Sequence, residues 1–350
     1  MQIERGPKKR DMLYKHVCIE SFGYELPPHI ITSAAIEDKL APLYDKLKLP
    51  YGRLEMMSGI RERRFWDEGA MPSQVAAKAG ANALRNSCTQ ADEIECLLHT
   101  SVCRDMLEPA TATLVHRALG LAKDCTIYDI SNACLGFLNG MVTLANMIEL
   151  GQVKKGMIVS GESSRQLVET TIQSLLNKPN PTREDIKEAF ASLTIGSGAC
   201  ALVMAHDSVS KFKHHLLGGA VRCATEFNHL CRGNAGNMNT DSETLLQEGC
   251  KLAKYTWQKT QEILGWTNNV VDRVFCHQVG AAHRKLLYKS LELDQAKDFS
   301  TVEYLGNTGS ASLPTTMAIG IEKAPPPPDT NIAMLGIGSG LNCLMLGVKW

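Results

Sequence analysis

Three side chains that could carry chemistry stand at the ends of apolar stretches. Cys134 in DISNACLGF follows a strand-like segment and opens an apolar helix, where unpaired amides and the helix dipole should lower the thiol pKa. His277 ends the strand-like segment RVFCHQV, and Asn307 in YLGNTGSAS lies in a small-residue turn before a helix. These types suit nucleophilic catalysis by Cys134, with His277 exchanging a proton in a cleft.

Each of these residues also has an ordinary interpretation. Free cysteine is among the most buried residue types, a lone histidine is more often a satisfied core residue, and asparagine is common in turns and N-caps. Glu108 directly precedes Pro109, which is typical of an acidic residue at a helix start with proline at the first helical position. The positions of these residues relative to an internal repeat favour a catalytic interpretation over the ordinary one.

The repeat joins AKDCTIYDISNACLG at residues 122–136 to AKDFSTVEYLGNTGS at residues 296–310, an offset of 174 residues. Each copy begins with AKD. The residues that follow predict an apolar strand and then a small-residue turn that opens a helix. Cys134 and Asn307 therefore occupy repeat-related turns, and His277 ends the strand just before the second turn. Turns at the carboxyl ends of strands are where α/β folds place reactive groups.

The surrounding elements alternate in both halves of the chain. Helices are predicted over residues 72–87, 135–150, 243–266 and 310–322, and strands over 94–102, 155–163, 272–279 and 331–340. Each half should be a mostly parallel sheet covered by helices. We predict an α/β fold, a thiolase-like five-layered α-β-α-β-α sandwich of two pseudo-twofold-related halves. The first half spans 1–192, with a cap insertion at about 165–192, and the second spans 193–350.

Composition narrows the class of protein. The 350 residues carry 37 Lys plus Arg and 37 Asp plus Glu, a net charge of zero, and 44% are hydrophobic. Such a chain folds into a sizeable core, and without a basic run it lacks the attraction on which nucleic-acid binding and membrane docking depend. The start has no apolar stretch, and glycines in 331–349 favour two strands and a turn over a membrane span. We expect a cytoplasmic protein.

The twelve cysteines form no CxxC pair, so we expect neither disulfides nor structural zinc. Cys223, His229 and Cys231 match no standard zinc spacing, and no metal is predicted. The turn GIGSGL has Leu341 where a dinucleotide-binding GxGxxG would need its third glycine, and a strand rather than a helix should follow it. A nicotinamide enzyme is therefore disfavoured.

The motifs DISNACLGF, CHQVG, GNTGSASLP and LGIGSGLNCLMLGVKW resemble the thiolase superfamily, specifically the β-ketoacyl-ACP synthase III group, over about residues 58–350. The resemblance implies that Cys134 is the acylated nucleophile, and that His277 and Asn307 hold the thioester carbonyl of the second substrate. It also implies that the backbone N–H groups of Cys134 and Ser339 form the oxyanion hole. The HQAN motif that is usual in that group reads HQVG here. The asparagine that is replaced is not one of the three residues named as catalytic.

The segments LPYGRLEMMSGIRERR and SVCRDMLEPATATLVH, with GSGAC near residue 198, resemble the branch that condenses two long-chain acyl-CoAs head to head for olefin or ketone synthesis. In that branch a glutamate at the position of Glu108 acts as the base in the partner subunit's active site, which implies a homodimer. We favour this reaction, because removing an α-proton requires a base. Decarboxylative condensation with malonyl-ACP in fatty-acid initiation, and a non-condensing partner subunit, stay open.

The substrates are acyl thioesters, and no cofactor is expected beyond the coenzyme A or acyl carrier protein that carries them. The sequence does not decide between the two carriers. Acyl chain length depends on the shape of a tunnel that the cap and residues such as Met141, Leu144 and Phe190 are expected to line.

Overall fold

The computed structural model describes residues 11–234 and 236–350. A ten-stranded sheet runs through the molecule in the order β12-β13-β14-β9-β2-β8-β7-β5-β6, with β1 added beside β9. Its strands are β1 (Met12–Leu13), β2 (Val17–Glu25), β5 (Cys96–His99), β6 (Thr126–Asp129), β7 (Lys155–Glu162), β8 (Gly198–His206), β9 (His214–Cys223), β12 (Arg273–Cys276), β13 (Asn331–Gly338) and β14 (Asn342–Lys349). The hairpin β13–β14 confirms the two strands predicted over residues 331–349.

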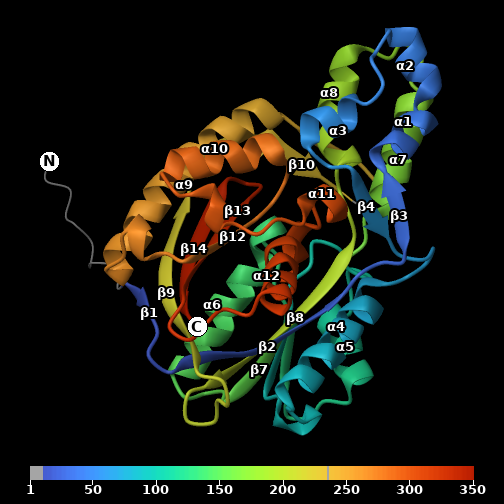
Figure 1. Ribbon diagram of the computed structural model, residues 1–350. Coiled ribbons are helices and arrows are strands. Elements are labelled where there is room, and N and C mark those ends of the chain that lie inside the picture. The colour runs from blue at the N-terminus through green and yellow to red at the C-terminus, as the bar shows by residue number, and fades with distance from the viewer. Residues whose placement is uncertain (1–10, 235) are drawn as a thin grey trace, which may run out of the picture.

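Helices cover this sheet on both sides and fill its middle (Figure 1). The central layer is made by α6 (Gly136–Glu149) and α12 (Ser312–Lys323), which lie between the two halves of the sheet. One outer layer is α4 (Pro72–Ser87) and α5 (Thr111–Leu119), and the other is α9 (Ser242–Leu264) and α10 (Ala281–Leu291). The predicted α/β five-layered sandwich is confirmed.

Side-chain alternation along the buried strands explains the layers. In β8, Cys200, Leu202 and Met204 pack into the central cluster with α6 and α12, whereas Ala199, Ala201 and Val203 pack against α4 on the other face. Successive side chains of a strand point to opposite faces, so a strand covered on both sides is apolar throughout. A third cluster joins α9 and α10 to β13 and β14.

Pseudo-symmetry is visible in the strand order. Outward from the centre, β2-β8-β7-β5-β6 of one half is matched by β9-β14-β13-β12 of the other, and β2 pairs with β9 through Cys18 and Ile19. The strand β8 begins after the predicted boundary at residue 192, yet it pairs with β7 and β2 of the first half. The division into domains at residues 192 and 193 stays a prediction, but the sheet of the first half extends beyond it.

Two details of the predicted elements are wrong. The sheet is mixed rather than mostly parallel: only β6-β5-β7 and β12-β13 are parallel, because β14 returns beside β13 through a tight turn and β8 runs against β7. The strand predicted after the second AKD is reduced to a single bridge at Asp298 and a helical turn, α11 (Val302–Leu305). There, the N–H groups of Thr301 and Val302 are bonded to the Gln278 side chain instead of to a strand.

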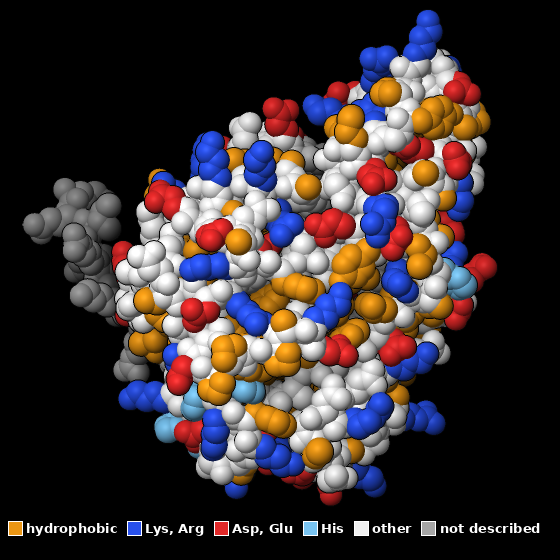
Figure 2. Space-filling model, viewed as in Figure 1, with side chains coloured by type: hydrophobic (Ala, Val, Ile, Leu, Met, Phe, Trp, Pro, Cys, Tyr) orange, Lys and Arg blue, Asp and Glu red, His pale blue; other side chains and the backbone are white. Residues whose placement is uncertain are grey.

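A cap stands on one end of the sandwich (Figure 1). Its helices form an apolar cluster of their own: α1 (Ser33–Lys39), α2 (Ala41–Leu47), α3 (Arg53–Ser58), α7 (Arg165–Leu176) and α8 (Arg183–Leu193). The predicted insertion supplies only α7 and α8, and the other three helices come from the segment around the hairpin of β3 (His29–Thr32) and β4 (Glu62–Phe65). The face in Figure 2 mixes positive and negative side chains.

In the described part of the chain, no helix combines the length and the apolar character needed to cross a membrane.

Candidate active site

The central turn that carries Cys134 links β6 to α6. A short 3-10 turn, Ala133–Leu135, leads directly into the helix, and Ala133 has a φ of 46°, a left-handed conformation that costs a residue with a side chain about 1–3 kcal/mol. Gly136 allows the close packing: a Cβ there would lie 2.3 Å from the carbonyl oxygen of Thr100 and 3.0 Å from Ser310 Oγ. The turn is therefore tightly held at the middle of the sandwich.

Desolvation dominates the electrostatics of the Cys134 thiol, although the residue as a whole is only half-buried. Desolvation, followed by the charge of Glu162, raises the pKa of Cys134 to about 12, although the backbone N–H groups of Cys134 and Ser339 oppose the rise. The prediction of a lowered pKa is thus wrong, because a single 3-10 turn offers too little positive potential to offset burial beside a carboxylate. The thiol is protonated at rest, and the backbone N–H groups of Cys134 and Ser339 act on it by lowering its pKa.

His277 lies one residue beyond β12, where its N–H donates to the Leu335 carbonyl (2.9 Å) and continues the ladder with β13. Its side chain is buried, and neither ring nitrogen has a hydrogen-bond partner among the described residues. Burial, reinforced by the nearby His283, lowers the pKa of His277 to about 3. The imidazole is therefore neutral near pH 7, and an unpartnered buried ring is an available donor or acceptor for a substrate.

Gln278, the next residue, fixes the approach to Asn307. Its buried side-chain oxygen accepts the N–H groups of Thr301 and Val302, both at 3.0 Å, and its amide donates to the Phe299 carbonyl at 2.7 Å. One side chain therefore ties the end of β12 to the segment that leads into the asparagine turn.

Asn307 is held at both its backbone and its side chain. Its N–H donates to the Thr194 carbonyl (3.1 Å), its carbonyl accepts from Gly196 (2.8 Å), and its Oδ1 accepts the N–H of Gly309 (3.0 Å). Among the described residues no hydrogen bond involves the Nδ2 amide, which leaves it available to donate. Ser310 Oγ accepts the N–H of Phe137 at 2.9 Å, so the turn carrying Asn307 is bonded directly to the first turn of the Cys134 helix.

Contacts link the segments that carry four of the predicted residues, Cys134, His277, Asn307 and Ser339. The backbone groups of Ser339 and Cys134 both lower the pKa of the Cys134 thiol. The strand β13, which ends beside Ser339, is paired with the strand that leads to His277. Gly338 packs closely on the Cys134 turn, since a Cβ at that position would lie 3.2 Å from Leu135 Cγ. Asn307 joins through the Ser310 contact.

Glu108 lies elsewhere, on an exposed loop before α5. The helix begins at Thr111 rather than at Pro109, and its first N–H groups, those of Thr111 and Ala112, are capped by the Asp129 carboxylate at 2.9 and 2.8 Å. The ordinary interpretation of Glu108 as a helix-start acid is therefore wrong. Within residues 11–234 and 236–350, no hydrogen bond or ion pair involves its side chain.

Glu162 is a site residue that the sequence analysis missed. It ends the wholly buried strand β7 and is 4% exposed, and its carboxylate accepts the N–H groups of Val102 (2.9 Å), Cys103 (3.1 Å) and Ser310 (3.0 Å). A charged residue closing the apolar segment KGMIVSGE was the available signal, because an unpaired buried carboxylate is costly. His283 was missed as well; burial lowers its pKa to about 4.

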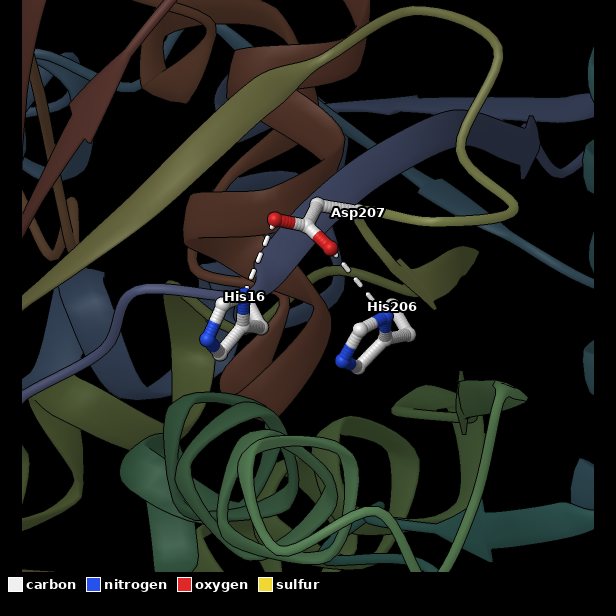
Figure 3. A group of neighbouring side chains, drawn as sticks. All are labelled: His16, His206 and Asp207. Atoms are coloured by element: carbon white, nitrogen blue, oxygen red, sulfur yellow. Dashed lines mark hydrogen bonds and ion pairs between the residues drawn. The ribbon is translucent and has the colours of Figure 1, made fainter.

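One group among the described residues has the spacing of metal ligands: His16, His206 and Asp207 (Figure 3). The Asp207 carboxylate contacts His16 Nδ1 at 2.9 Å and His206 Nδ1 at 3.1 Å, and the N–H of Ser208 donates to that same nitrogen of His206. The ligand atoms of His16 and Asp207 therefore pair with each other, and that of His206 accepts a backbone N–H. The cysteine and histidine set considered in the sequence, Cys223, His229 and Cys231, is not such a group.

The three residues suggested for an acyl tunnel do not lie together. Met141 and Leu144 are fully buried in the central cluster, and Phe190 packs against the cap cluster. The turn GIGSGL joins two antiparallel strands, as predicted, and opens no helix of the dinucleotide-binding kind.

Known proteins share this fold and match nearly the whole chain. Residues 128–218 match the family described as 3-oxoacyl-[acyl-carrier-protein (ACP)] synthase III, and residues 262–350 match its C-terminal family. An acyl-CoA:acyl-CoA alkyltransferase of Shewanella oneidensis is 43% identical over 97% of this chain and 100% of its own. One of Xanthomonas campestris pv. campestris is 38% identical with the same coverage.

Solved structures agree with the sequence comparisons. The Xanthomonas campestris OleA structure of a cysteine-to-serine variant with bound lauric acid and lauroyl-CoA has a TM-score of 0.94 and 38% identity, covering 97% of this chain and 100% of that one. The fold and these relatives define an acyltransferase of the thiolase superfamily. Within that class, the chain belongs to the family of the acyl-CoA:acyl-CoA alkyltransferases.

Proposed function

We propose that this enzyme condenses two acyl-CoA molecules head to head, with Cys134 as the nucleophile and Glu108 of a partner subunit as the base. The observation that carries the proposal is the buried His277, whose ring nitrogens have no hydrogen-bond partner among the described residues, beyond a strand paired with β13, which packs against the Cys134 turn. Family membership supports the same reaction, since two relatives are named acyl-CoA:acyl-CoA alkyltransferases.

The first step is transfer of an acyl group from coenzyme A to Cys134. The sulfur attacks the thioester carbonyl, the carbon–sulfur bond to coenzyme A breaks, and the proton lost by Cys134 leaves on the coenzyme A thiol. The backbone N–H groups of Cys134 and Ser339, which act on the thiol, would receive the developing oxyanion. These donors are fixed before reaction, so they need no reorganisation.

The second step makes the new carbon–carbon bond. Glu108 takes an α-proton from the second acyl-CoA, and its enolate oxygen accepts hydrogen bonds from neutral His277 and the free amide of Asn307. The α-carbon attacks the Cys134 thioester and expels the thiolate, which is then protonated. The product is a β-ketoacyl-CoA, and hydrolysis of its thioester gives the β-keto acid.

The exposed loop supports a base that acts in the partner subunit. The Glu108 side chain makes no hydrogen bond or ion pair within the described part of its own chain, while Leu107 beside it is 93% exposed and Val102 is 52% exposed. Large apolar side chains left in solvent at that level mark a surface that another protein covers. A second copy of the chain would bury them and receive Glu108, which makes the active enzyme a homodimer.

The decarboxylative reaction with malonyl-ACP is the second candidate. It is favoured by the two matches to 3-oxoacyl-ACP synthase III families, which together span most of the catalytic turns. Loss of carbon dioxide would generate the carbanion without a base, so Glu108 would have no role. A non-condensing subunit is disfavoured because Cys134, His277 and Asn307 are all retained.

Twelve free cysteines, none of them in a disulfide, support a reducing and hence cytoplasmic location. The carrier of the second acyl group is proposed to be coenzyme A.

Supplying acyl-CoA as the only substrate tests the reaction. We expect a β-keto acid built from two acyl chains, or the ketone left by its decarboxylation, and an acyl adduct on Cys134 by intact mass. Glu108→Gln should keep the adduct but lose product by at least about 100-fold, because a general base contributes that much, while Cys134→Ala should lose both. Product only upon adding malonyl-ACP would overturn the proposal.

A further inference from the structure

The Glu162 carboxylate is buried at the carboxyl end of β7, where it accepts N–H groups from two other parts of the chain. Oε1 accepts the N–H of Val102 at 2.9 Å and that of Ser310 at 3.0 Å, while Oε2 accepts the N–H of Cys103 at 3.1 Å. The fit is close: a Cβ on Gly309 would lie 3.0 Å from Oε1. Gly309 itself has a φ of 57°, which glycine adopts without penalty.

The two segments that Glu162 joins carry different parts of the chemistry. Val102 and Cys103 begin the loop that carries Glu108, and Ser310 stands three residues after Asn307. Ser310 in turn accepts the N–H of Phe137, in the first turn of the Cys134 helix. The Glu162 side chain therefore sets the spacing between the turn that carries Asn307 and the start of the loop that carries Glu108.

Glu162 also acts on the thiol through its charge. After desolvation, it is the largest contribution that raises the pKa of Cys134. Burial raises the pKa of Glu162 as well, and its three N–H donors oppose this rise by stabilising the carboxylate. A group that served only to fill space would not need a charge beside the nucleophile.

We propose that Glu162 is a positioning residue for condensation, which fixes the Asn307 turn and the start of the Glu108 loop about Cys134. This role rests on the proposed function. Glu162 itself need not touch substrate. Acyl transfer to Cys134 depends on the N–H groups of Cys134 and Ser339, neither of which Glu162 holds, so the second step should depend on Glu162 more than the first.

The test compares wild type with Glu162→Gln. This variant keeps the shape of the side chain but removes its charge, and it places an NH2 group opposite a backbone N–H donor. Glu20→Gln is the matched control. Glu20 is also buried (5% exposed) and also accepts a backbone N–H, that of Lys211 at 3.1 Å, together with the Ser210 hydroxyl, but it contacts no part of the site. Condensation rate, acyl-enzyme level and alkylation of Cys134 by iodoacetamide against pH are measured.

For Glu162→Gln we expect condensation to fall at least about tenfold, because small misplacement of reacting groups is costly. Acyl-enzyme should accumulate, and Cys134 should alkylate at least about threefold faster at pH 8, because loss of a neighbouring negative charge lowers a thiol pKa. Unchanged condensation would overturn the proposal. So would parallel loss of both steps with no change in the alkylation profile, which indicates only damaged structure.

The two proposals fail in distinguishable ways. If wild type makes product only with malonyl-ACP, the head-to-head reaction is wrong. The Glu162 comparison then runs on the malonyl-dependent reaction, which also uses Cys134 and Asn307. In that case the Glu108 loop takes no part in the reaction. Accumulation of acyl-enzyme then tests only whether Glu162 positions the Asn307 turn.

Discussion

At the scale of single residues, the site keeps polar groups buried without partners. Both ring nitrogens of His277 lack a hydrogen bond in the described structure, and its pKa is lowered to about 3. A free protein gains nothing from such an arrangement, because an unsatisfied buried group costs about 1–3 kcal/mol. In the proposed reaction the cost is recovered when a substrate carbonyl supplies the partner, which would give the site its affinity for an enolate.

His277 should therefore make the enzyme acid-sensitive. Its folded pKa lies below the value of 6.5 expected in the unfolded chain, so the unfolded state binds more protons and stability is lost as pH falls below 6.5. Between pH 7.5 and 5.5 the loss assigned to this one group is about 1.4 kcal/mol. Urea unfolding of His277→Asn at both pH values should show a loss smaller by that amount. Equal losses in the two proteins would mean that His277 titrates normally in the fold.

At the scale of elements, one backbone crossing positions Asn307. Residues 194–196 run beside residues 305–307, with a parallel bridge from Ile195 to Asn307 and an N–H bond from Gly196 to the Asn307 carbonyl. The crossing is so close that a Cβ on Gly196 would lie 1.9 Å from the Leu305 carbonyl oxygen. Backbone cannot move aside as a side chain can, so glycine is required there.

Gly196→Ala should destabilise the protein by about 1–3 kcal/mol, the usual cost of overpacking, and should reduce condensation by displacing Asn307. Gly198→Ala is the control two residues away. Its Cβ would meet nothing nearer than Thr308 Cγ2 at 3.6 Å, an ordinary contact. Thermal unfolding and product formation are measured for both. If the two variants behave alike, the crossing does not position Asn307.

Periodic elements could be predicted from sequence, and contacts between distant segments could not. The helix over residues 72–87 is found unchanged as α4, because its apolar spacing is a local property. The strand expected after Asp298 failed because Gln278, twenty residues away, takes its N–H groups. The prediction of a lowered pKa for the Cys134 thiol is wrong for the same reason. A helix dipole can be inferred from the sequence, whereas burial beside Glu162 cannot.

At the scale of the whole molecule, the two halves assemble one site, yet they leave its proposed base outside. The turns of Cys134 and Asn307 meet through Phe137 and Ser310 across the pseudo-twofold axis. Glu108 lies on an exposed stretch of its loop, and its side chain has no hydrogen bond or ion pair with the described residues of the same chain. Symmetry then favours a twofold dimer, since an isologous contact lets each loop enter the other subunit's site.

Mixing two inactive variants tests whether Glu108 acts across such a dimer. Cys134→Ala retains Glu108, and Glu108→Gln retains Cys134, so each homodimer is inactive. In a mixed dimer, one site combines an intact Cys134 with the intact Glu108 of the other subunit, and the second site lacks both. Random exchange makes about half of the dimers mixed, so activity should recover to about a quarter of wild type.

Exchange is driven by brief partial denaturation and followed by the mass of the mixed species, and product is then assayed from acyl-CoA alone. The double variant Cys134→Ala with Glu108→Gln, mixed with wild type, is the matched control. Its mixed dimer gains no complete site if the base acts in trans, because the wild-type Cys134 then faces a glutamine in place of the base, and the wild-type Glu108 faces the replaced cysteine. Mixed dimers that form but give no product from the two single variants would place the base within one chain.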